Sequence, residues 1–282
     1  MKMNYLIILA YDEEVRIPIG TQMLLKSFES NFQSFLREWQ VIILTPRRFA
    51  NRILKRKLAE YKVNFESFHF PNVENIYMNK AILYEFSKTN LKRQDKVLYL
   101  DYDHLCLRPF ALPKLRRHEI MLGSKTENVA SAIKSDSVAM RADFMRLTNV
   151  HYNSSLIYAY RDDLIAATQS WINLYKKYKN HIRYRDVEEI TLSLSCIYSG
   201  YKPTTAPKSL QGTWPCVSKS ALFHYGGETI AAAVIKNFLD KKISREELMQ
   251  RFTKKQEESC LNHILSYYDS IQKTSYETKS SD

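Results

Sequence analysis

The sequence feature that most constrains this chain is a short apolar run that ends in two carboxylates. Val97 to Leu100 have the length and composition of a fully buried strand. Asp101 and Asp103 follow two positions apart, so in extended chain both side chains leave on the same side. Two adjacent carboxylates repel each other unless a cation lies between them, and parallel sheets bind ligands at the carboxyl ends of strands. The pair therefore predicts a metal site there; the alternative is two solvated aspartates in a turn.

Strand and helix patterns alternate before this run. Apolar or alternating stretches predict strands, and apolar residues at helical spacing predict helices. The expected elements are strands at 5–10, 41–44 and 63–70 and helices at 20–32, 47–61 and 76–86. This alternation predicts an α/β fold with a mostly parallel central sheet and helices on both faces.

The second half of the chain is expected to complete the sheet. Further strands are predicted at residues 120–123, 155–160 and 221–223. One amphipathic helix is predicted from Asp162 to Tyr178, with acids at its start and lysines near its end. Asp186 is a candidate N-cap of the next helix, with Glu189 three residues later as in a capping box.

The C-terminal part is predicted to be helical. Ser244 and Glu247 have the spacing of a capping box. We therefore expect one main domain over residues 1–228, a helical extension over 229–273 and a frayed polar tail over 274–282.

Charge and cysteine content narrow the partners and the compartment. Much of the net charge of +12 lies in basic clusters at residues 47–57, 114–117 and 176–185. Such clusters favour an anionic partner, namely nucleotide phosphates, a lipid headgroup surface or nucleic acid, and solvated helix faces are the alternative.

The sequence contains no apolar run of membrane-spanning length, and acidic residues directly follow the first apolar stretch, which favours a strand over a signal peptide. The four widely spaced cysteines are expected to be reduced thiols of a cytoplasmic protein.

The run Val97-Leu98-Tyr99-Leu100-Asp101-Tyr102-Asp103 resembles the acidic signature of GT-A glycosyltransferases, and most of all the family 8 type with its galactosyl-, glucosyl- and glycogenin-like enzymes. Other segments within residues 3–228 resemble that family's motifs in the same order. They are Ala10-Tyr11-Asp12, Lys80, Asn153-Ser154-Ser155, Asp186 with Glu189, and His224-Tyr225-Gly226-Gly227. The resemblance implies a single Rossmann-like GT-A domain that transfers a sugar from a nucleotide-diphospho sugar.

The resemblance also implies a role for each matching residue. The metal ligands would be Asp101, Asp103 and His224. The donor would be bound by Ala10, Tyr11, Asp12, Lys80, Tyr102, Ser154, Ser155, Gly226 and Gly227. Catalysis beside the donor sugar and the acceptor would involve Asp186, Glu189 and Asn153. Structural alternatives are a core role for His224, a surface role for Lys80 and a helix cap for Asp186.

The expected cofactor is Mn²⁺, with Mg²⁺ as the alternative, because an imidazole ligand suits a transition metal. The cation would stabilise the charge of a departing nucleoside diphosphate, expected to be UDP, and the family 8 likeness implies retention of configuration. Two positions depart from the family pattern. Ser155 replaces a common Gly, and Glu228-Thr229-Ile230 replaces a Lys-Pro-Trp that often follows the late glycine.

The acceptor is less constrained than the donor. A cell-surface glycan such as lipopolysaccharide, met at the inner membrane face, would suit the basic clusters through peripheral contact with anionic headgroups. A second possibility is glycosylation of a modified base in nucleic acid, since separate Arg/Lys clusters can follow a phosphate backbone. A third is a phosphate- or nucleic-acid-binding module without catalysis.

Overall fold

A seven-stranded sheet forms the centre of the computed structural model, which describes residues 2–10, 16–47, 52–70, 74–127, 129–134, 150–214, 220–226, 230–252 and 255–277. The strand order is β10-β6-β9-β4-β1-β2-β3. Their bounds are β1 Asn4–Leu9, β2 Gln40–Pro46, β3 Val63–Phe68, β4 Lys96–Leu100, β6 Glu119–Leu122, β9 Leu156–Tyr160 and β10 Lys202–Thr205. Val97 to Leu100 are 0% exposed, which confirms the fully buried strand predicted there.

The sheet is mostly parallel, as predicted. β4, β1, β2 and β3 run parallel to one another, and so do β10 and β6. β9 is the exception, because it runs antiparallel to both of its neighbours, β4 and β6. This reversal brings the chain that enters β9 to the carboxyl end of β4, where the Asp101 amide donates to the Ser155 carbonyl at 2.9 Å. The segment around Asn153 is thereby placed beside the acidic pair.

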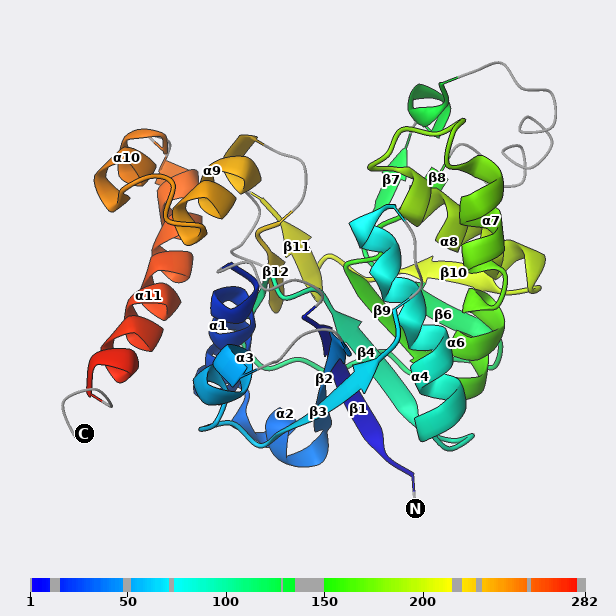
Figure 1. The fold of residues 1–282 in the computed structure, drawn as a ribbon, viewed down its shortest axis with the longest axis horizontal. Helices are drawn as coiled ribbons and strands as arrows, with labels where there is room; N and C mark the ends of the chain where they lie inside the picture. The colour runs from blue at the N-terminus through cyan, green and yellow to red at the C-terminus, as the bar shows by residue number, and fades with distance from the viewer. Residues whose placement is uncertain are drawn as a thin grey trace.

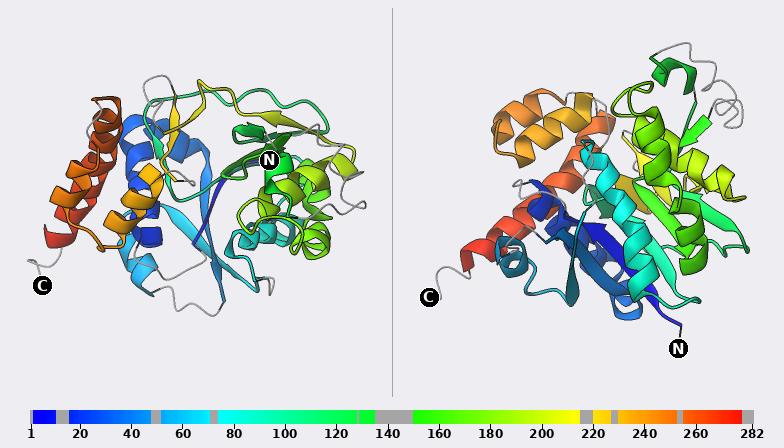
Figure 2. Two further views of the ribbon diagram at one scale, coloured as in Figure 1. Left: turned by 90° about the horizontal axis from the view of Figure 1, so that it is seen from above. Right: turned by 45° about the vertical axis from the view of Figure 1, so that its right-hand side comes forward.

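Helices cover both sides of the sheet (Figures 1 and 2). On one side lie α1 Arg16–Asn31, α2 Gln33–Glu38 and α3 Arg52–Lys57. On the other side lie the 3₁₀ helix η1 Ile76–Ala81 and the helices α4 Ile82–Asn90, α6 Arg161–Thr168, α7 Trp171–Tyr178 and α8 Val187–Tyr198. Helices on both faces were predicted from the alternating pattern, and the structure confirms them.

The prediction of one helix from Asp162 to Tyr178 is wrong, because the segment forms two helices, α6 and α7. The Thr168 hydroxyl donates back to the Leu164 carbonyl at 2.6 Å, which satisfies an acceptor near the end of α6. The turn that follows lets the fully buried Trp171 indole donate to the Glu188 carbonyl at 3.1 Å. Helical periodicity continues through the break, so the sequence pattern does not reveal it.

Small sheets join the main one near the carboxyl end of β4. One contains β5 His104–Cys106, β11 Gln211–Thr213 and β12 Leu222–His224, in the order β11-β12-β5. The other pairs β7 Lys125–Glu127 with β8 Val150–Tyr152, and the 3₁₀ helix η2 Val129–Ala132 follows β7. β12 confirms the strand predicted near 221–223, and its antiparallel pairing with β5 sets His224 directly opposite His104.

The C-terminal helices α9 Ile230–Leu239, α10 Arg245–Gln250 and α11 Lys255–Glu277 pack on α1, β5 and β12 (Figure 2). Their apolar side chains form a second core with Met23, Leu105 and Phe223. The predicted capping box of α10 is confirmed, since Glu247 N donates to Ser244 Oγ at 3.1 Å and Ser244 N donates to Glu247 Oε2 at 2.7 Å.

Two further sequence predictions concern thiols and membrane spans. Cys106, Cys196 and Cys260 are buried free thiols, as expected, while Cys216 lies outside the described residues. Among the helices of the described ranges, none combines the length and the apolar character that crossing a bilayer requires.

Candidate active site

A pocket of about 330 Å³ opens at the carboxyl ends of β4 and β12. Its lining comprises Tyr77, Lys80, Asp101, Tyr102, Asp103, His151, Asn153, Arg185, Asp186, Glu188, Glu189, His224 and Lys236. Eight of these side chains were singled out from the sequence. The structure therefore gathers residues from distant parts of the chain at the edge of the sheet where a ligand was predicted.

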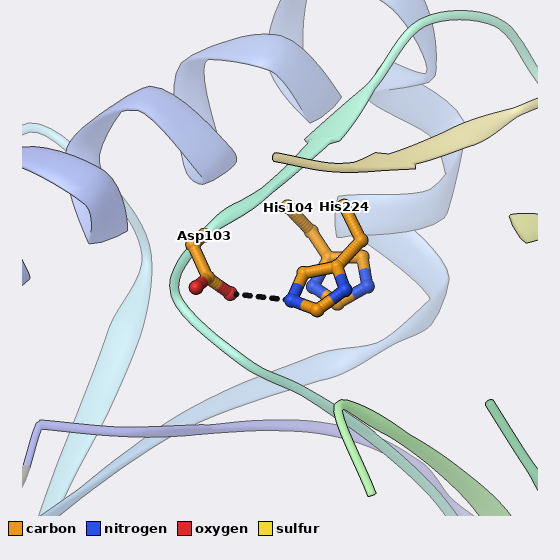
Figure 3. Close-up of side chains that lie close together, drawn as sticks. All are labelled: Asp103, His104 and His224. Carbon is orange, nitrogen blue, oxygen red and sulfur yellow. Dashed lines mark ion pairs between the residues drawn. The ribbon is translucent and has the colours of Figure 1, made fainter. Parts of the chain in front are cut away.

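Asp103 and His224 meet in the wall of this pocket (Figure 3). The Asp103 Oδ1 atom lies 3.2 Å from His224 Nε2, and both side chains are buried. The ring of His224 stacks on that of His104, with centroids 4.6 Å apart and an interplanar angle of 11°. Asp103, His104 and His224 form a group whose ligand atoms all lie within 4.8 Å of one another. His104 was not predicted, because its position depends on the pairing of β5 with β12.

Gly226 closes the wall behind Asp103. A Cβ atom at this position would lie 1.8 Å from Asp103 Oδ2 and 2.9 Å from His224 Nε2. Such distances are far below van der Waals contact, so any other residue would displace the carboxylate. The position of Asp103 therefore requires glycine at 226, whereas the predicted donor-binding role of Gly226 stays a prediction.

Both ring nitrogens of His104 already have hydrogen-bond partners, so neither has a lone pair available for a metal ion. Its Nδ1 lies 3.1 Å from the Asp101 carbonyl, and its Nε2 lies 2.9 Å from Gln211 Nε2. A carbonyl needs a donor, so the proton is assigned to Nδ1, and Nε2 accepts from the Gln211 amide. Burial and the neighbouring His224 lower the pKa of His104 to about 3, so the ring stays neutral. His104 therefore orients its neighbours.

The Asp103 carboxylate fits a divalent cation. Burial would raise the pKa of Asp103, but His224 and then Lys236 lower it below its usual range, so the group is ionised. Among the residues that the structure describes, none makes a hydrogen bond to the buried Oδ1 atom, although His224 Nε2 lies 3.2 Å from it. Neighbouring ligands of an octahedral ion bound at about 2.1 Å are about 3 Å apart. The separation of 3.2 Å between Asp103 Oδ1 and His224 Nε2 matches that edge, so the carboxylate and the imidazole have the spacing of two adjacent ligands of such an ion.

Asp101 lies in the same pocket but has different partners. A turn at residues 102–103 separates the two carboxylates, so the extended chain assumed from the sequence ends at Asp101. Lys80 Nζ lies 3.0 Å from Asp101 Oδ2, and the Tyr99 hydroxyl donates to Oδ1. Burial alone would lower the pKa of Lys80, but Asp101 and Glu188 raise it above its ordinary value, so Lys80 is charged. Without an ion, Asp101 is balanced by this lysine.

A second wall of the pocket comes from β8, the chain before β9 and α8, and Lys80 contacts both this wall and Asp101. Asn153 Nδ2 donates to Glu189 Oε1 at 2.6 Å, and His151 Nε2 lies 3.1 Å from Glu189 Oε2. Ser154 Oγ donates to Glu188 Oε2 at 2.8 Å and accepts from Lys80 Nζ at the same distance. Burial raises the pKa of Glu188 to about 8, against the opposing effect of Lys80.

The predicted capping box of Asp186 with Glu189 is wrong. Asp186 occupies the N-cap position of α8, but its side chain caps no backbone amide. Its backbone is helical, with φ −90° and ψ −19°, whereas an N-cap normally needs the extended region to reach over the first turn. Asp186 Oδ2 instead accepts from Arg183 Nε at 2.6 Å. Glu189 is consequently free to turn toward the pocket, where Asn153 binds it.

The remaining predicted donor residues lie behind the lining or outside the described residues. Ala10 is buried in the sheet, where its amide donates to the Leu44 carbonyl at 2.9 Å. Ser154 and Ser155 are also buried, and the Ser155 hydroxyl accepts from Gln211 Nε2 at 3.0 Å. Tyr11, Asp12 and Gly227 belong to segments outside the described ranges. The donor-binding roles of all these residues stay predictions.

Other lining residues were given no role from the sequence. They are Tyr77, His151, Arg185, Glu188 and Lys236. Glu188 and Arg185 are sequence neighbours of predicted residues, so proximity to Asp186 was an available signal. Lys236 lies in α9, within the segment predicted as a separate extension, and no local pattern connects it to the acidic strand.

Comparison with known proteins identifies the fold. No protein-family model matches the chain, and neither does any curated protein sequence. Among solved structures, the galactosyltransferase LgtC in complex with donor and acceptor sugar analogs matches with a TM-score of 0.56 at 13% identity, over 86% of this chain and 98% of that one. The glycosyltransferase GlyE of Streptococcus pneumoniae TIGR4 matches with a TM-score of 0.50 at 11% identity, over 88% of this chain and 63% of that one. Mouse xyloside xylosyltransferase 1 matches with a TM-score of 0.50 at 9% identity, over 79% of this chain and 97% of that one.

Identities this low carry information about the fold, and the fold agrees with the prediction from the acidic strand. A mostly parallel seven-stranded sheet, helices on both faces and a pocket at the carboxyl end of the acidic strand occur together. This chain has the fold of the GT-A glycosyltransferases.

Proposed function

We propose that this protein is a metal-dependent glycosyltransferase that moves a sugar from a UDP-linked donor to an acceptor hydroxyl. The observation that carries the proposal is the buried, ionised Asp103 carboxylate, 3.2 Å from His224 Nε2. No hydrogen bond to its Oδ1 comes from the described part of the chain. Burying an ionised carboxylate is costly unless positive charge and hydrogen-bond donors surround it, and a divalent cation would supply further positive charge.

The metal site of the proposal consists of Asp103 and His224, with Asp101 as a third ligand from the same pocket. Carboxylate oxygens with one imidazole favour Mn²⁺ over Mg²⁺ or Ca²⁺. When bound, the cation supplies a Lewis acid for the charge that develops on the departing diphosphate. If the metal ion binds Asp101, Lys80 loses its ion pair with that carboxylate. The charged Lys80 side chain could then turn toward the donor.

Two lysines are placed to balance the remaining phosphate charge. Lys80 reaches the pocket from η1, and Lys236 reaches it from α9. The charge of Lys236 acts on Asp103, whose pKa it helps to lower. The family pattern often has Lys-Pro-Trp where this chain has Glu228-Thr229-Ile230. Lys236 in α9 would supply the positive charge that the missing lysine provides in that pattern. The C-terminal helices would then belong to the active site as well as to the core.

The wall formed by Asn153, Glu188 and Glu189 is proposed to orient sugar hydroxyls. Glu189 is held by Asn153 and by His151, which fixes its carboxylate in the pocket. Hydrogen-bonding groups held in this way position a substrate at little entropic cost. We include retention of configuration in the proposal on the strength of the family 8 resemblance, and a cell-surface glycan as acceptor class. Anomeric NMR of the first product tests the stereochemistry.

A nucleotide-release assay tests the proposal as a whole. The purified protein is incubated with Mn²⁺ and a panel of UDP-, GDP- and CDP-sugars, and the released nucleoside diphosphate is measured. We expect release from one UDP-sugar, its loss on chelation with EDTA, and stronger recovery with Mn²⁺ than with Mg²⁺. If no sugar nucleotide is consumed in the presence of any divalent cation, the catalytic proposal fails and a binding module remains.

A further inference from the structure

A second hollow adjoins the candidate active site. It measures about 350 Å³ and is lined by Lys134, Arg183, Tyr184, Arg185 and Asp186. Arg185 and Asp186 also line the first pocket. A molecule that lies in the second hollow therefore has one end beside the proposed donor site, which is where an acceptor must present its hydroxyl.

Tyr184 is an exposed aromatic residue that is held rigidly. Its side chain is 47% exposed. The Tyr184 hydroxyl donates to the Glu74 carbonyl at 3.3 Å and accepts from the Ile76 amide at 3.2 Å, and its own carbonyl accepts from Asn75 Nδ2 at 2.6 Å. The ring also packs edge-on against Tyr77, with centroids 6.3 Å apart. An aromatic face that is exposed and already ordered loses little entropy when a ligand covers it.

The cations around Tyr184 are placed by backbone pairing. Ile133 and Ile182 form an antiparallel bridge. On either side of it, Lys134 N donates to the His181 carbonyl at 2.7 Å and Arg183 N donates to the Ala132 carbonyl at 2.8 Å. This pairing fixes the exposed Lys134 beside the segment that carries Arg183 and Arg185.

Positive charge exceeds negative charge on this surface. The cationic side chains are Lys134, Lys179, Arg183 and Arg185, and the carboxylates are Glu74 and Asp186. Both carboxylates are already paired, Asp186 with Arg183 at 2.6 Å and Glu74 with Lys179 at 3.0 Å. Among the residues named here, four cationic side chains and two carboxylates surround the exposed ring, so the formal charge is positive, and Arg185 also has an interaction of its own.

We propose that Lys134, Arg183, Tyr184 and Arg185 form the acceptor surface, and that the acceptor is an anionic glycan whose terminal sugar carries a phosphate or a carboxylate. The Tyr184 ring provides an apolar face for the C–H groups of a sugar ring. The arginines and the lysine bind the anion, and a guanidinium matches a phosphate or carboxylate in two-pronged geometry. The term acceptor rests on the proposed function, whereas the binding itself needs no turnover.

Equilibrium binding tests the ligand chemistry. The protein, without a donor, is titrated by calorimetry or NMR with glucose 6-phosphate, glucuronic acid, glucose and inorganic phosphate. We expect each charged sugar to bind about tenfold or more tightly than glucose, with an affinity that falls as salt is raised. Equal affinity for glucose would overturn the anionic acceptor, and binding of inorganic phosphate as tight as that of glucose 6-phosphate would overturn the role of the Tyr184 ring.

Variants test the location. Lys134→Glu is expected to weaken glucose 6-phosphate binding about tenfold, and Tyr184→Leu by several-fold, whereas Tyr184→Phe retains the ring and most of the affinity. Lys202→Glu, at an exposed position of the edge strand β10, is the charge-matched control and is expected to bind normally. Normal binding by Lys134→Glu would overturn the assignment. The protein is also tested for retention on phosphatidylglycerol vesicles. If Lys134→Glu abolishes this retention but leaves glucose 6-phosphate binding unchanged, the surface binds lipid headgroups, and the assignment to an acceptor glycan is overturned.

Nucleotide release separates this inference from the proposed function. Wild-type glucose 6-phosphate binding with no nucleotide release from any donor would sustain the anionic surface and remove the proposed function. Normal nucleotide release with glucose 6-phosphate binding that no variant alters would sustain the proposed function and remove this inference.

Discussion

Different kinds of partner hold the carboxylates on the two sides of the pocket. On the strand wall, the buried Asp103 Oδ1 lies 3.2 Å from His224 but receives no hydrogen bond from the residues that the structure describes. On the helix wall, Glu189 is held by Asn153 and His151, and Glu188 is held by Ser154. Burial also raises the pKa of Glu188 to about 8, so most Glu188 side chains carry a proton and are neutral at pH 7.

The difference between the walls indicates a division of labour. We propose that a cation from solution binds at the strand wall, in addition to Lys80, which pairs with Asp101, and to His224 and Lys236, which lower the pKa of Asp103. On the helix wall, hydrogen bonds hold the carboxylates of Glu188 and Glu189 in place, so these groups can present fixed atoms to a sugar. Within the described residues, Glu188 Oε1 and His151 Nδ1 have no hydrogen bond, so a ligand can bind there. Substitutions on the first wall should therefore affect metal affinity, whereas substitutions on the second should affect turnover without a change in metal affinity.

The largest effect is expected from Asp103→Ala. Loss of the buried carboxylate removes a metal ligand, so Mn²⁺-dependent transfer should fall about 100-fold or more while the fold is retained. The measurement is nucleotide release against Mn²⁺ concentration, with circular dichroism as the check on folding. Asp95→Asn is the matched control, because Asp95 is a fully buried carboxylate at the other end of β4 that accepts from two backbone amides, Met3 N and Lys92 N. It should lower stability and leave the Mn²⁺ midpoint unchanged; the reverse pattern would contradict the strand-wall assignment.

Gly226→Ala should follow, with a loss of about tenfold or more in transfer. The added Cβ would lie 1.8 Å from Asp103 Oδ2, so the carboxylate must move away from His224. A raised Mn²⁺ midpoint in the same release assay is the expected signature. Gly200→Ala serves as control, because Gly200 has φ +79° but no atom within 4 Å of the position of a Cβ. It should cost about 1 kcal/mol of stability and no activity.

Glu189→Gln probes the helix wall. The amide keeps one oxygen for Asn153 but gives up the carboxylate that faces His151. We expect kcat to fall about tenfold with the Mn²⁺ midpoint unchanged. A midpoint that shifts as far as it does in Asp103→Ala would show that the two walls act as one, and the comparison would fail.

The smallest effect concerns stability and pH. The pKa of Glu188 is raised to about 8 from 4.5, so the native state binds an extra proton between these values. The stabilising contribution is complete below about pH 4.5 and is lost as the pH rises through about 8. Urea unfolding at pH 5 and pH 8 should therefore show a smaller decline in free energy for Glu188→Gln than for the wild type, by about 1 kcal/mol or more. Identical declines would mean that Glu188 is ionised throughout this range.

Sequence patterns predicted the elements whose signal is local. The β4 strand was recognisable from four consecutive apolar residues, and the structure buries all four completely. The capping box of α10 was recognisable because it needs only Ser244 and Glu247. Patterns failed where a tertiary contact decides. The break between α6 and α7 serves the packing of Trp171 under α8, and Asp186 prefers Arg183 to the helix amides. The strands β5 and β11 are three residues each, too short for periodicity to identify.

The sequence by itself determined the alternation of strands and helices, the buried strand that ends in two aspartates, and most of the residues that line the pocket. These features follow from the order of residue types along the chain. Only the tertiary structure decided that Asp103 faces His224 and His104 while Asp101 faces Lys80. It also decided that Lys236 enters the pocket from α9. The reason is physical: which side chains share a buried charge depends on strand pairing and helix packing between segments far apart in the chain, and no local pattern encodes those distances.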